Sequence, residues 1–313
     1  MNKPVGSLHM GLKGEYRYAL YNVQDDGSLR IHRETDWEDN LITNLGLAQM
    51  TEVAWYSRCI TGTSAVAPDV TDTSMVGSFL AASSSVSTAS TVNLGSPTYA
   101  CQQVNVYRFN QGVTTGTIQE IGLSNLATGA NICSHYLPSA PIVVAANQVL
   151  DIYFRFTVYP ELADWTGTAT IGGVDYDVVM RYFSIATARG TLVQFSPSTF
   201  YSYWYTTDGP LGLITSGGPT GNALQNLVYG DWGPVGWVVL NTTYYRDMFA
   251  KYGLTKNNHS PGAWLRCSAG VFSPIAPFQC QFTATNGPDI GEGIPKDYTK
   301  ELTLTYRATW GRH

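Results

Sequence analysis

The sequence predicts a mainly β protein made of two β-sandwich-like units with one short N-terminal helix. The leading observation is a strand pattern that occurs twice, L-x-[IL]-x-[FY]-R-x-T, at residues 150–157 and again at residues 302–309. Apolar residues at every second position are typical of a strand with one buried face. The runs between are punctuated by Gly and Pro turn signals, and only one segment has a helical period. The repeat favours an internal duplication, and chance similarity between two short strands is the alternative.

The first third of the chain is predicted to contain a hairpin and then the helix. Residues 15–33 alternate in polarity around Asp25-Asp26-Gly27, which is a hairpin signal. An apolar stripe predicts a short helix near residues 45–56, with Asn44 as its N-cap. Residues 60–92 are rich in Ser, Thr, Ala and Gly. We expect them to form a long connection with short strands that reaches a neighbouring subunit in an assembly.

The rest of the chain reads as strands separated by turns. A hairpin is expected around Gly172-Gly173, because adjacent glycines supply the positive φ of a two-residue turn. We therefore divide the chain into an N-terminal β unit over 1–160, a hairpin and Gly/Pro-rich connection over 161–235, and a C-terminal β unit over 236–313. The expected strands are 102–109, 117–123, 131–137, 149–159, 236–246, 264–272, 277–285 and 298–310.

The composition is poor in charge. Asp, Glu, Lys and Arg make up 13% of the residues, about half of the roughly 25% in typical soluble proteins. A chain with so little charge is expected to cover much of its surface with partners. A stable β protein with an uncharged polar surface is the alternative. The net charge of −5 and the lack of a Lys/Arg run argue against nucleic-acid binding.

Membrane insertion, classical export and cysteine-based scaffolds are not expected. The longest apolar stretches, such as residues 142–146, fall short of the ~20 residues that span a bilayer. Residues 1–7 have no apolar signal core. The odd, widely spaced cysteines lack a C-x-x-C pair and are predicted to be buried free thiols in a reducing cytoplasm. They are Cys59, Cys101, Cys133, Cys267 and Cys280.

No catalytic, cofactor-binding or metal-binding residue is predicted, and we expect the chain not to be an enzyme. It has no G-x-S-x-G elbow, and its G-x-G occurrences do not join a strand to a helix. The histidines lie in separate segments without an H-x-x-x-H partner, which argues against a metal site. They are His9, His32, His135, His259 and His313.

Three acidic segments could have either a catalytic or metal-binding role or an ordinary solvent-exposed one. Residues 34–39 (Glu34-Thr35-Asp36-Trp37-Glu38-Asp39) offer paired carboxylates for glycoside cleavage, but a solvated turn ahead of the helix is the favoured reading. Asp175 and Asp177 share a strand face beside a turn, as on the solvent side of a hairpin. Residues 289–292 (Asp289-Ile290-Gly291-Glu292) lack the D-x-D-x-D-G loop of a calcium site.

Four stretches carry a resemblance to a known group of proteins. Residues 37–47 match an N-L-I-x-x-x-G-L pattern that leads into a short helix. Residues 61–75 are similar to a G-T-G-x-x-x-x-P…D-T-x-L segment, although Ser64 replaces the second glycine and Met75 follows Ser74. The third stretch comprises residues 106–109, 118–123 and 149–152, and the fourth residues 294–297 and 302–310. In this order, over about half of the chain, they resemble virion structural proteins of tailed bacteriophages, described as tail, baseplate, collar or fibre components.

The resemblance implies a β-rich, oligomeric, non-enzymatic particle component that is made in the host cytoplasm without a signal. Our leading hypothesis is a structural protein of the tail, baseplate or neck/collar region of a virion. It would assemble as a symmetric homo-oligomer and join other phage proteins, without cofactor, nucleic acid or membrane insertion. The family is not defined by a catalytic motif, so the resemblance implies no functional residue.

Two other functions stay open from the sequence. A receptor- or glycan-binding fibre or appendage would use exposed aromatics such as Trp204, Trp232 and Trp237. A virion-borne glycan depolymerase would use the carboxylates of residues 34–39. The repeated strand leaves a further question, because Arg155 and Arg307 lie off the apolar stripe. Each is expected on the opposite sheet face, either solvated or paired across an interface.

Overall fold

The computed structural model describes residues 4–49, 56–93, 100–161, 163–182, 201–205, 235–238, 244–254, 264–268, 278–295 and 298–313. These residues are mainly β with one short helix, as predicted. The chain divides into two compact units. The barrel unit comprises Leu12–Thr91, Cys101–Val158 and Arg312–His313, and the second unit comprises Met1–Gly11, Val92–Ala100 and Tyr159–Gly311.

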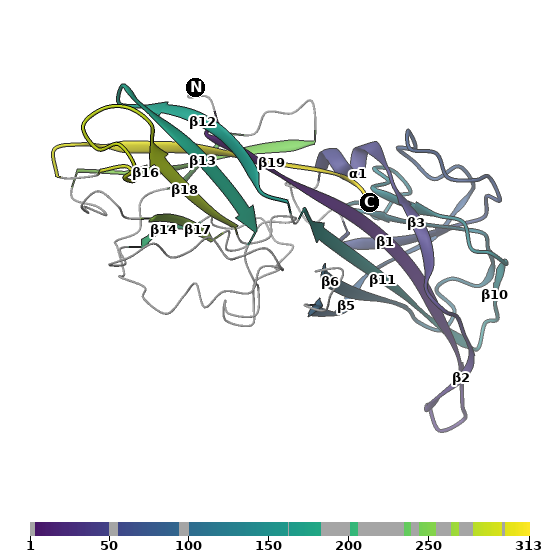
Figure 1. Cartoon of the computed structure of the whole chain (residues 1–313). Coiled ribbons are helices and arrows are strands. Elements are labelled where there is room, and N and C mark those ends of the chain that lie inside the picture. The colour runs from purple at the N-terminus through teal and green to yellow at the C-terminus, as the bar shows by residue number, and fades with distance from the viewer. Residues whose placement is uncertain are drawn as a thin grey trace. The chain divides into compact units, whose positions relative to one another are not determined.

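The barrel unit is a closed barrel of eight strands rather than the expected sandwich (Figure 1). The strands follow one another around it as β1-β3-β9-β8-β4-β5-β6-β11, and β11 pairs with β1 to close the ring. Closure leaves no free sheet edge, whereas a sandwich keeps its edges. The bounds are β1 (Gly6–Val23), β3 (Glu38–Ile42), β4 (Arg58–Gly62), β5 (Phe79–Asn93), β6 (Ala100–Phe109), β8 (Glu120–Ser124), β9 (Ser134–Tyr136) and β11 (Gln148–Pro160).

Aromatic side chains fill the barrel. Tyr16 of β1 stacks on Tyr136 of β9 with ring centroids 5.1 Å apart, and it lies at the same distance from the tilted ring of Phe154. The apolar stripe of the first strand copy is buried at every second residue, at Leu150, Ile152, Phe154 and Phe156. An eight-stranded barrel has an interior that side chains can fill. The stripe predicted from the sequence therefore faces this core.

The predicted N-terminal hairpin is confirmed, and the helix is shorter than expected within the described residues. β2 (Leu29–Glu34) pairs antiparallel with the end of β1, and Gly27 in the turn has a φ of 79°. The helix α1 spans Asn44–Gln49. The side chain that caps it is Thr43, whose Oγ1 accepts a hydrogen bond from the Gly46 N–H at 3.0 Å. Residues 50–55 of the expected helix lie outside the described residues.

The Ser/Thr-rich stretch is a loop followed by a long strand, not a connection with short strands. Residues 63–78 form a loop between β4 and β5, and β5 then runs for 15 residues between β4 and β6. Its small polar side chains gave no apolar alternation in the sequence. Strand pairing uses backbone hydrogen bonds, which any residue but proline supplies, so this segment forms barrel wall without an apolar stripe.

The second unit contains the predicted Gly-Gly hairpin and the second strand copy. β12 (Trp165–Ile171) and β13 (Val174–Tyr182) join through Gly172 and Gly173, with φ of 59° and 83°, and β13 also pairs with β18 (Phe278–Ala284). β19 (Leu302–Arg312) pairs with β16 (Tyr245–Tyr252) and β1, and its alternate residues from Leu302 to Trp310 are buried. The other pairs are β15 (Val235–Val238) with β16, β14 (Tyr201–Tyr205) with β17 (Trp264–Ser268), and, in the barrel unit, β7 (Gly116–Ile118) with β10 (Ile142–Val144).

The three-part division at residues 160 and 235 stays a prediction. The compact units change over at Tyr159, close to the first boundary, but the second unit also takes the first eleven residues. β1 contributes its beginning to one unit and the rest to the other. Most of the predicted Gly/Pro-rich connection, residues 206–234, lies outside the described residues.

Candidate functional site

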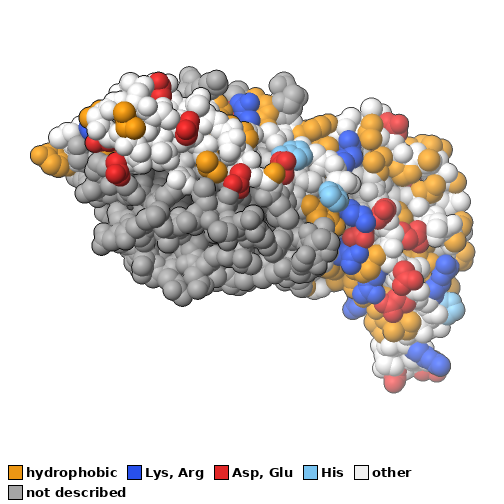
Figure 2. Space-filling model, in the orientation of Figure 1, with side chains coloured by type: hydrophobic (Ala, Val, Ile, Leu, Met, Phe, Trp, Pro, Cys, Tyr) orange, Lys and Arg blue, Asp and Glu red, His pale blue; other side chains and the backbone are white. Residues whose placement is uncertain are grey.

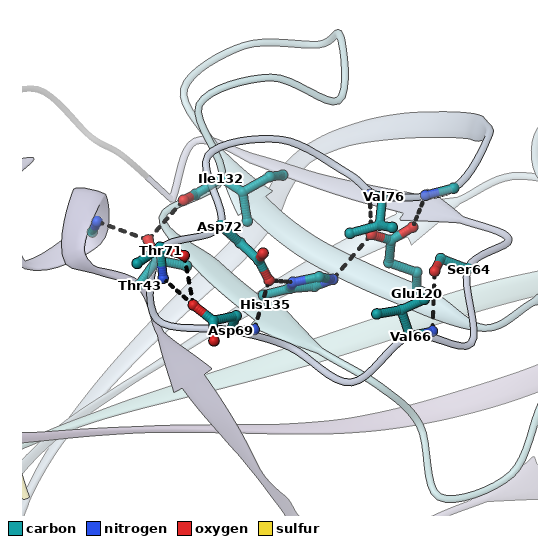
Figure 3. Close-up of polar contacts among 12 residues, drawn as sticks. Thr43, Ser64, Val66, Asp69, Thr71, Asp72, Val76, Glu120, Ile132 and His135 are labelled. Atoms are coloured by element: carbon teal, nitrogen blue, oxygen red, sulfur yellow. Dashed lines mark hydrogen bonds and ion pairs between the residues drawn. The ribbon is translucent and has the colours of Figure 1, made fainter.

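Three titratable side chains meet beneath the loop of residues 63–78 (Figure 3). His135 of β9 lies between Glu120 of β8 and Asp72 of the loop. Its Nδ1 is 2.6 Å from Asp72 Oδ2, and its Nε2 is 3.0 Å from Glu120 Oε1. The side chains of His135 and Glu120 are each 1% exposed, and that of Asp72 is 17% exposed. We call this group the His135 clamp.

Both carboxylates of the clamp also bind the loop backbone. The two oxygens of Glu120 accept hydrogen bonds from the N–H groups of Val76 and Gly77, at 2.6 and 3.0 Å. Asp72 Oδ2 accepts a hydrogen bond from the Asp69 N–H at 2.8 Å. The clamp therefore ties two parts of the loop to neighbouring strands of the barrel wall, because β8 and β9 pair directly.

Backbone hydrogen bonds hold the same loop at other points. Met75 N–H donates to Gly129 O at 2.7 Å, and Ile132 N–H donates to Thr73 O at 3.1 Å. The N–H at the start of α1 donates to Val70 O at 2.8 Å. These bonds connect segments that are far apart in the sequence. The loop is thus fixed by neutral contacts as well as by the clamp.

Two glycines allow this close packing. A Cβ on Gly62 would lie 2.8 Å from Glu120 Oε2 and 2.6 Å from Met75 Cε. A Cβ on Gly46 would lie 1.9 Å from Cys133 O, beside β9. Both are glycines of the first two stretches that resemble phage proteins. Their place in those patterns has a physical reason, because any side chain would push backbone or a buried carboxylate away.

The electrostatics favour a charged imidazole. Burial lowers the pKa of His135, but hydrogen bonds and charge from Glu120 and Asp72 outweigh burial, so its pKa is raised above the usual 6.5. Burial raises the pKa of Glu120, and the bonds from His135 and from the Val76 and Gly77 N–H groups reverse this, so its pKa lies below the usual 4.5. The raised pKa of His135 and the lowered pKa of Glu120 both favour an imidazolium beside an ionised carboxylate.

The clamp has the chemistry of an anchor. Both ring nitrogens of His135 lie at ion-pair distance from a carboxylate oxygen, so neither is directed at a nucleophile. Within the described residues, no group of three or more His, Cys, Asp or Glu side chains is arranged to hold a metal ion. The arrangement is suited to fixing a loop whose residues then face outward.

The acidic residues considered for glycoside cleavage have separate partners. Glu34 pairs with Arg17. Glu38 accepts hydrogen bonds from the N–H and Oγ of Ser139 at 3.2 and 2.9 Å, and Asp39 lies 2.8 Å from Lys13 Nζ. The guanidinium of Arg155 lies over the ring of Trp37, 4.3 Å from the ring centroid. Asp36 is exposed.

Other candidate residues are spread over the molecule. Asp175 accepts hydrogen bonds from Thr170 and Asn286 at 2.6 and 2.7 Å, which form a local turn network, and Asp177 is exposed. His9 Nδ1 lies 2.9 Å from Thr309 Oγ1, and His32 is exposed on β2. Trp204 and Trp237 belong to β14 and β15, whose side chains are outside the described part, as are Trp232 and His259. The predicted buried free thiols are confirmed at Cys59 and Cys133, and Cys280 is buried as predicted.

The repeated arginine pairs within the chain in both copies. Arg155 binds Glu15 of β1 through two hydrogen bonds of 2.7 Å. Arg307 binds Asp247, its direct cross-strand neighbour on β16, at 2.6 and 2.7 Å. Figure 2 shows Lys, Arg, Asp and Glu side chains interleaved over the barrel unit. The positive charges of Arg155 and Arg307 are therefore neutralised by carboxylates of the same sheet.

Sequence reasoning missed the clamp because it treated His135 as an isolated histidine. The available signal was that Asp72 and Glu120 each lie in a stretch with the phage resemblance.

In the described residues no helix is long and apolar enough to cross a membrane. Comparison of the chain with models of protein families, with curated proteins and with solved structures found no match.

Proposed function

We propose that the chain is a non-enzymatic structural component of a tailed bacteriophage particle, from its tail, baseplate or neck region. It assembles as a symmetric homo-oligomer and joins other virion proteins. The observation that carries the proposal is that the first three of the resembling stretches meet around one loop. They contribute Gly46 at α1, Gly62 and Asp72 at the loop, and Glu120 at the clamp.

The end of the chain reaches the same region. Arg312, two positions after the fourth stretch, donates from Nε to Ile42 O at 2.6 Å and from Nη2 to Asn44 Oδ1 at 2.8 Å. Residues from the beginning, the middle and the end of the sequence thus support a single local structure. Their convergence on one loop favours a role for that loop.

The loop presents apolar side chains to solvent. Val66 is 56% exposed, Val76 is 51% exposed, and Val70 is also exposed. Phe79, at the start of β5, is 44% exposed. A rigid loop loses little conformational entropy when it binds, and exposed apolar side chains on it gain free energy when a contact buries them. We propose that this loop contacts a neighbouring subunit.

An internal duplication is a further part of the proposal. Both strand copies bury alternate residues, and both pair their arginine with a carboxylate on an adjacent strand. The two units have different sheet arrangements, with the closed barrel in one of them. A duplication would therefore have kept the strand and its arginine while the surrounding sheet diverged.

The test compares the size of the purified chain and of two valine variants by analytical ultracentrifugation. Val76→Asp, on the loop, is expected to weaken self-association by about tenfold or more, because a charge would have to be buried in the contact. Val143→Asp, on β10 where the valine is 65% exposed, is the matched control and should leave association unchanged. The proposal fails if the chain is absent from purified particles of the phage that encodes it, or if both variants behave alike.

A further inference from the structure

The His135 clamp places a carboxylate oxygen beside each ring nitrogen. Nδ1 forms a hydrogen bond with Asp72 Oδ2 at 2.6 Å, whereas Nε2 lies 3.0 Å from Glu120 Oε1 as an ion-pair contact without hydrogen-bond geometry. Only the imidazolium has two N–H donors, because a neutral imidazole leaves one nitrogen as an acceptor. A neutral His135 would therefore turn a lone pair toward Asp72 or Glu120. Glu120 is 1% exposed, so water has little access to screen the repulsion that replaces the ion pair.

We propose that the His135 clamp is a pH-sensitive lock on the loop of residues 63–78. The charged imidazole holds the loop against β8 and β9, and loss of its proton loosens the parts of the loop that the two carboxylates bind. This property goes beyond the proposed structural role. It belongs to the single chain, so it does not depend on whether the loop contacts a neighbour.

His135 is the positive partner of both clamp carboxylates. In the described part of the chain, neither Asp72 nor Glu120 forms an ion pair with Lys or Arg. The strand residues opposite His135 are Leu41 on β3 and Gly122 on β8, which do not titrate. The nearby Asp69 is exposed, and hydrogen bonds from Thr71 lower its pKa, so it stays ionised near neutral pH. The protonation of His135 thus decides whether the three side chains of the clamp carry one net negative charge or two.

The direction of the pH effect follows from the two shifted groups. The pKa of His135 is raised above 6.5 in the folded chain, so its stabilising effect is complete below about pH 6.5 and is lost as the pH rises through the folded value. The pKa of Glu120 is lowered below 4.5, so its effect is complete above about pH 4.5 and is lost as the pH falls through the folded value. The lock is therefore fully closed between about pH 4.5 and about pH 6.5.

The loosening is local because other bonds remain. The amides of Asp69, Val76 and Gly77 donate to the clamp carboxylates and should respond to pH. The amides of Met75 and Ile132 donate to backbone carbonyls, which do not titrate. The same region of the structure therefore contains both the reporters and their internal controls.

The test is amide hydrogen exchange of the chain, followed by NMR from about pH 5.5 to about pH 9, with the imidazole titration of His135 recorded alongside. Protection factors of the Asp69, Val76 and Gly77 amides should fall as His135 loses its proton. We expect about a tenfold fall for each unit by which the folded pKa of His135 exceeds its unfolded value. The factors of Met75 and Ile132 should change far less.

Two variants separate the lock from general destabilisation. Asp72→Asn keeps the shape of the side chain and removes one negative charge, so it should lower the pKa of His135 and reduce the pH dependence at Val76 and Gly77. His32→Gln changes an exposed histidine of β2 and should leave both profiles unchanged. The inference is overturned if wild-type His135 titrates at or below its usual pKa, or if the reporter amides show no more pH dependence than the controls.

Discussion

The two copies of the repeated strand, β11 and β19, place the same side chains in two different settings. In each, the arginine forms a two-pronged pair with a carboxylate on an adjacent strand. Each guanidinium also lies over an aromatic ring, Trp37 at 4.3 Å for Arg155 and Tyr245 at 4.0 Å for Arg307. The eight-residue pattern thus specifies a buried stripe on one face and a neutralised, stacked arginine on the other.

The copies differ in how many such pairs hold them. β11 has a second pair, because Asp151 binds Arg108 of β6 at 2.7 and 2.6 Å. The corresponding residue in β19 is Thr303, which cannot make an ion pair. β11 is therefore joined by ion pairs to both of its neighbours in the closed barrel, whereas the pattern in β19 supplies one pair. The strand pattern is shared, and the partners are provided by whichever strand lies beside it.

The largest expected effect comes from the buried stripes. Phe154→Ala and Tyr306→Ala change equivalent positions of β11 and β19, and both side chains are fully buried. Each should lower the free energy of unfolding by about 3–5 kcal/mol, because a large cavity replaces an aromatic ring. Chemical denaturation measures both, with the exposed Val143→Ala as a control expected within about 0.5 kcal/mol of wild type. A small loss for only one variant would show that the stripes are not equivalent.

The ion pairs should have intermediate effects that differ between the copies. Glu15→Gln leaves Arg155 without its charged partner, and we expect a loss of about 2 kcal/mol in unfolding free energy. Asp247→Asn should cost about 1 kcal/mol, because the side chain of Arg307 is 32% exposed against 24% for Arg155, and water replaces the lost bonds more easily.

The control for this pair of variants is Glu34→Gln. Glu34 pairs with Arg17 but its side chain is 44% exposed, so the expected loss is below about 0.5 kcal/mol. Denaturation curves for the three variants rank the pairs. Equal losses in all three would contradict the view that the repeated arginines form the stronger, partly buried pairs.

The sequence was sufficient for features set by neighbouring residues. Alternation at residues 150–157 and 302–309 predicted two strands with one buried face, and the glycines at 27 and at 172–173 predicted two hairpins. The helix cap was placed one residue late, because Thr43 and Asn44 are both suitable caps and only the observed hydrogen bond decides between them.

Features set by distant residues were beyond the sequence. Alternating strands are the same in a sandwich and in a barrel, so closure through the pairing of β1 with β11 left no local signal. The clamp joins His135 to Asp72, which lies 63 residues away. Its formation depends on the path of the loop, and that path depends on close approaches at Gly46 and Gly62 that only the folded chain makes visible.

The smallest expected effects concern the hairpin turns, where the two units should be alike. Gly27 in the barrel unit and Gly173 in the second unit have φ of 79° and 83°, and a Cβ on either meets nothing within 4 Å. Alanine at each position should therefore cost only the backbone strain, about 1 kcal/mol. Gly253→Ala is the control, since its Cβ also meets nothing within 4 Å and its φ is not in the left-handed region. Thermal unfolding should show similar losses for Gly27→Ala and Gly173→Ala and none for Gly253→Ala; unequal losses would mean that one hairpin is strained by more than its turn.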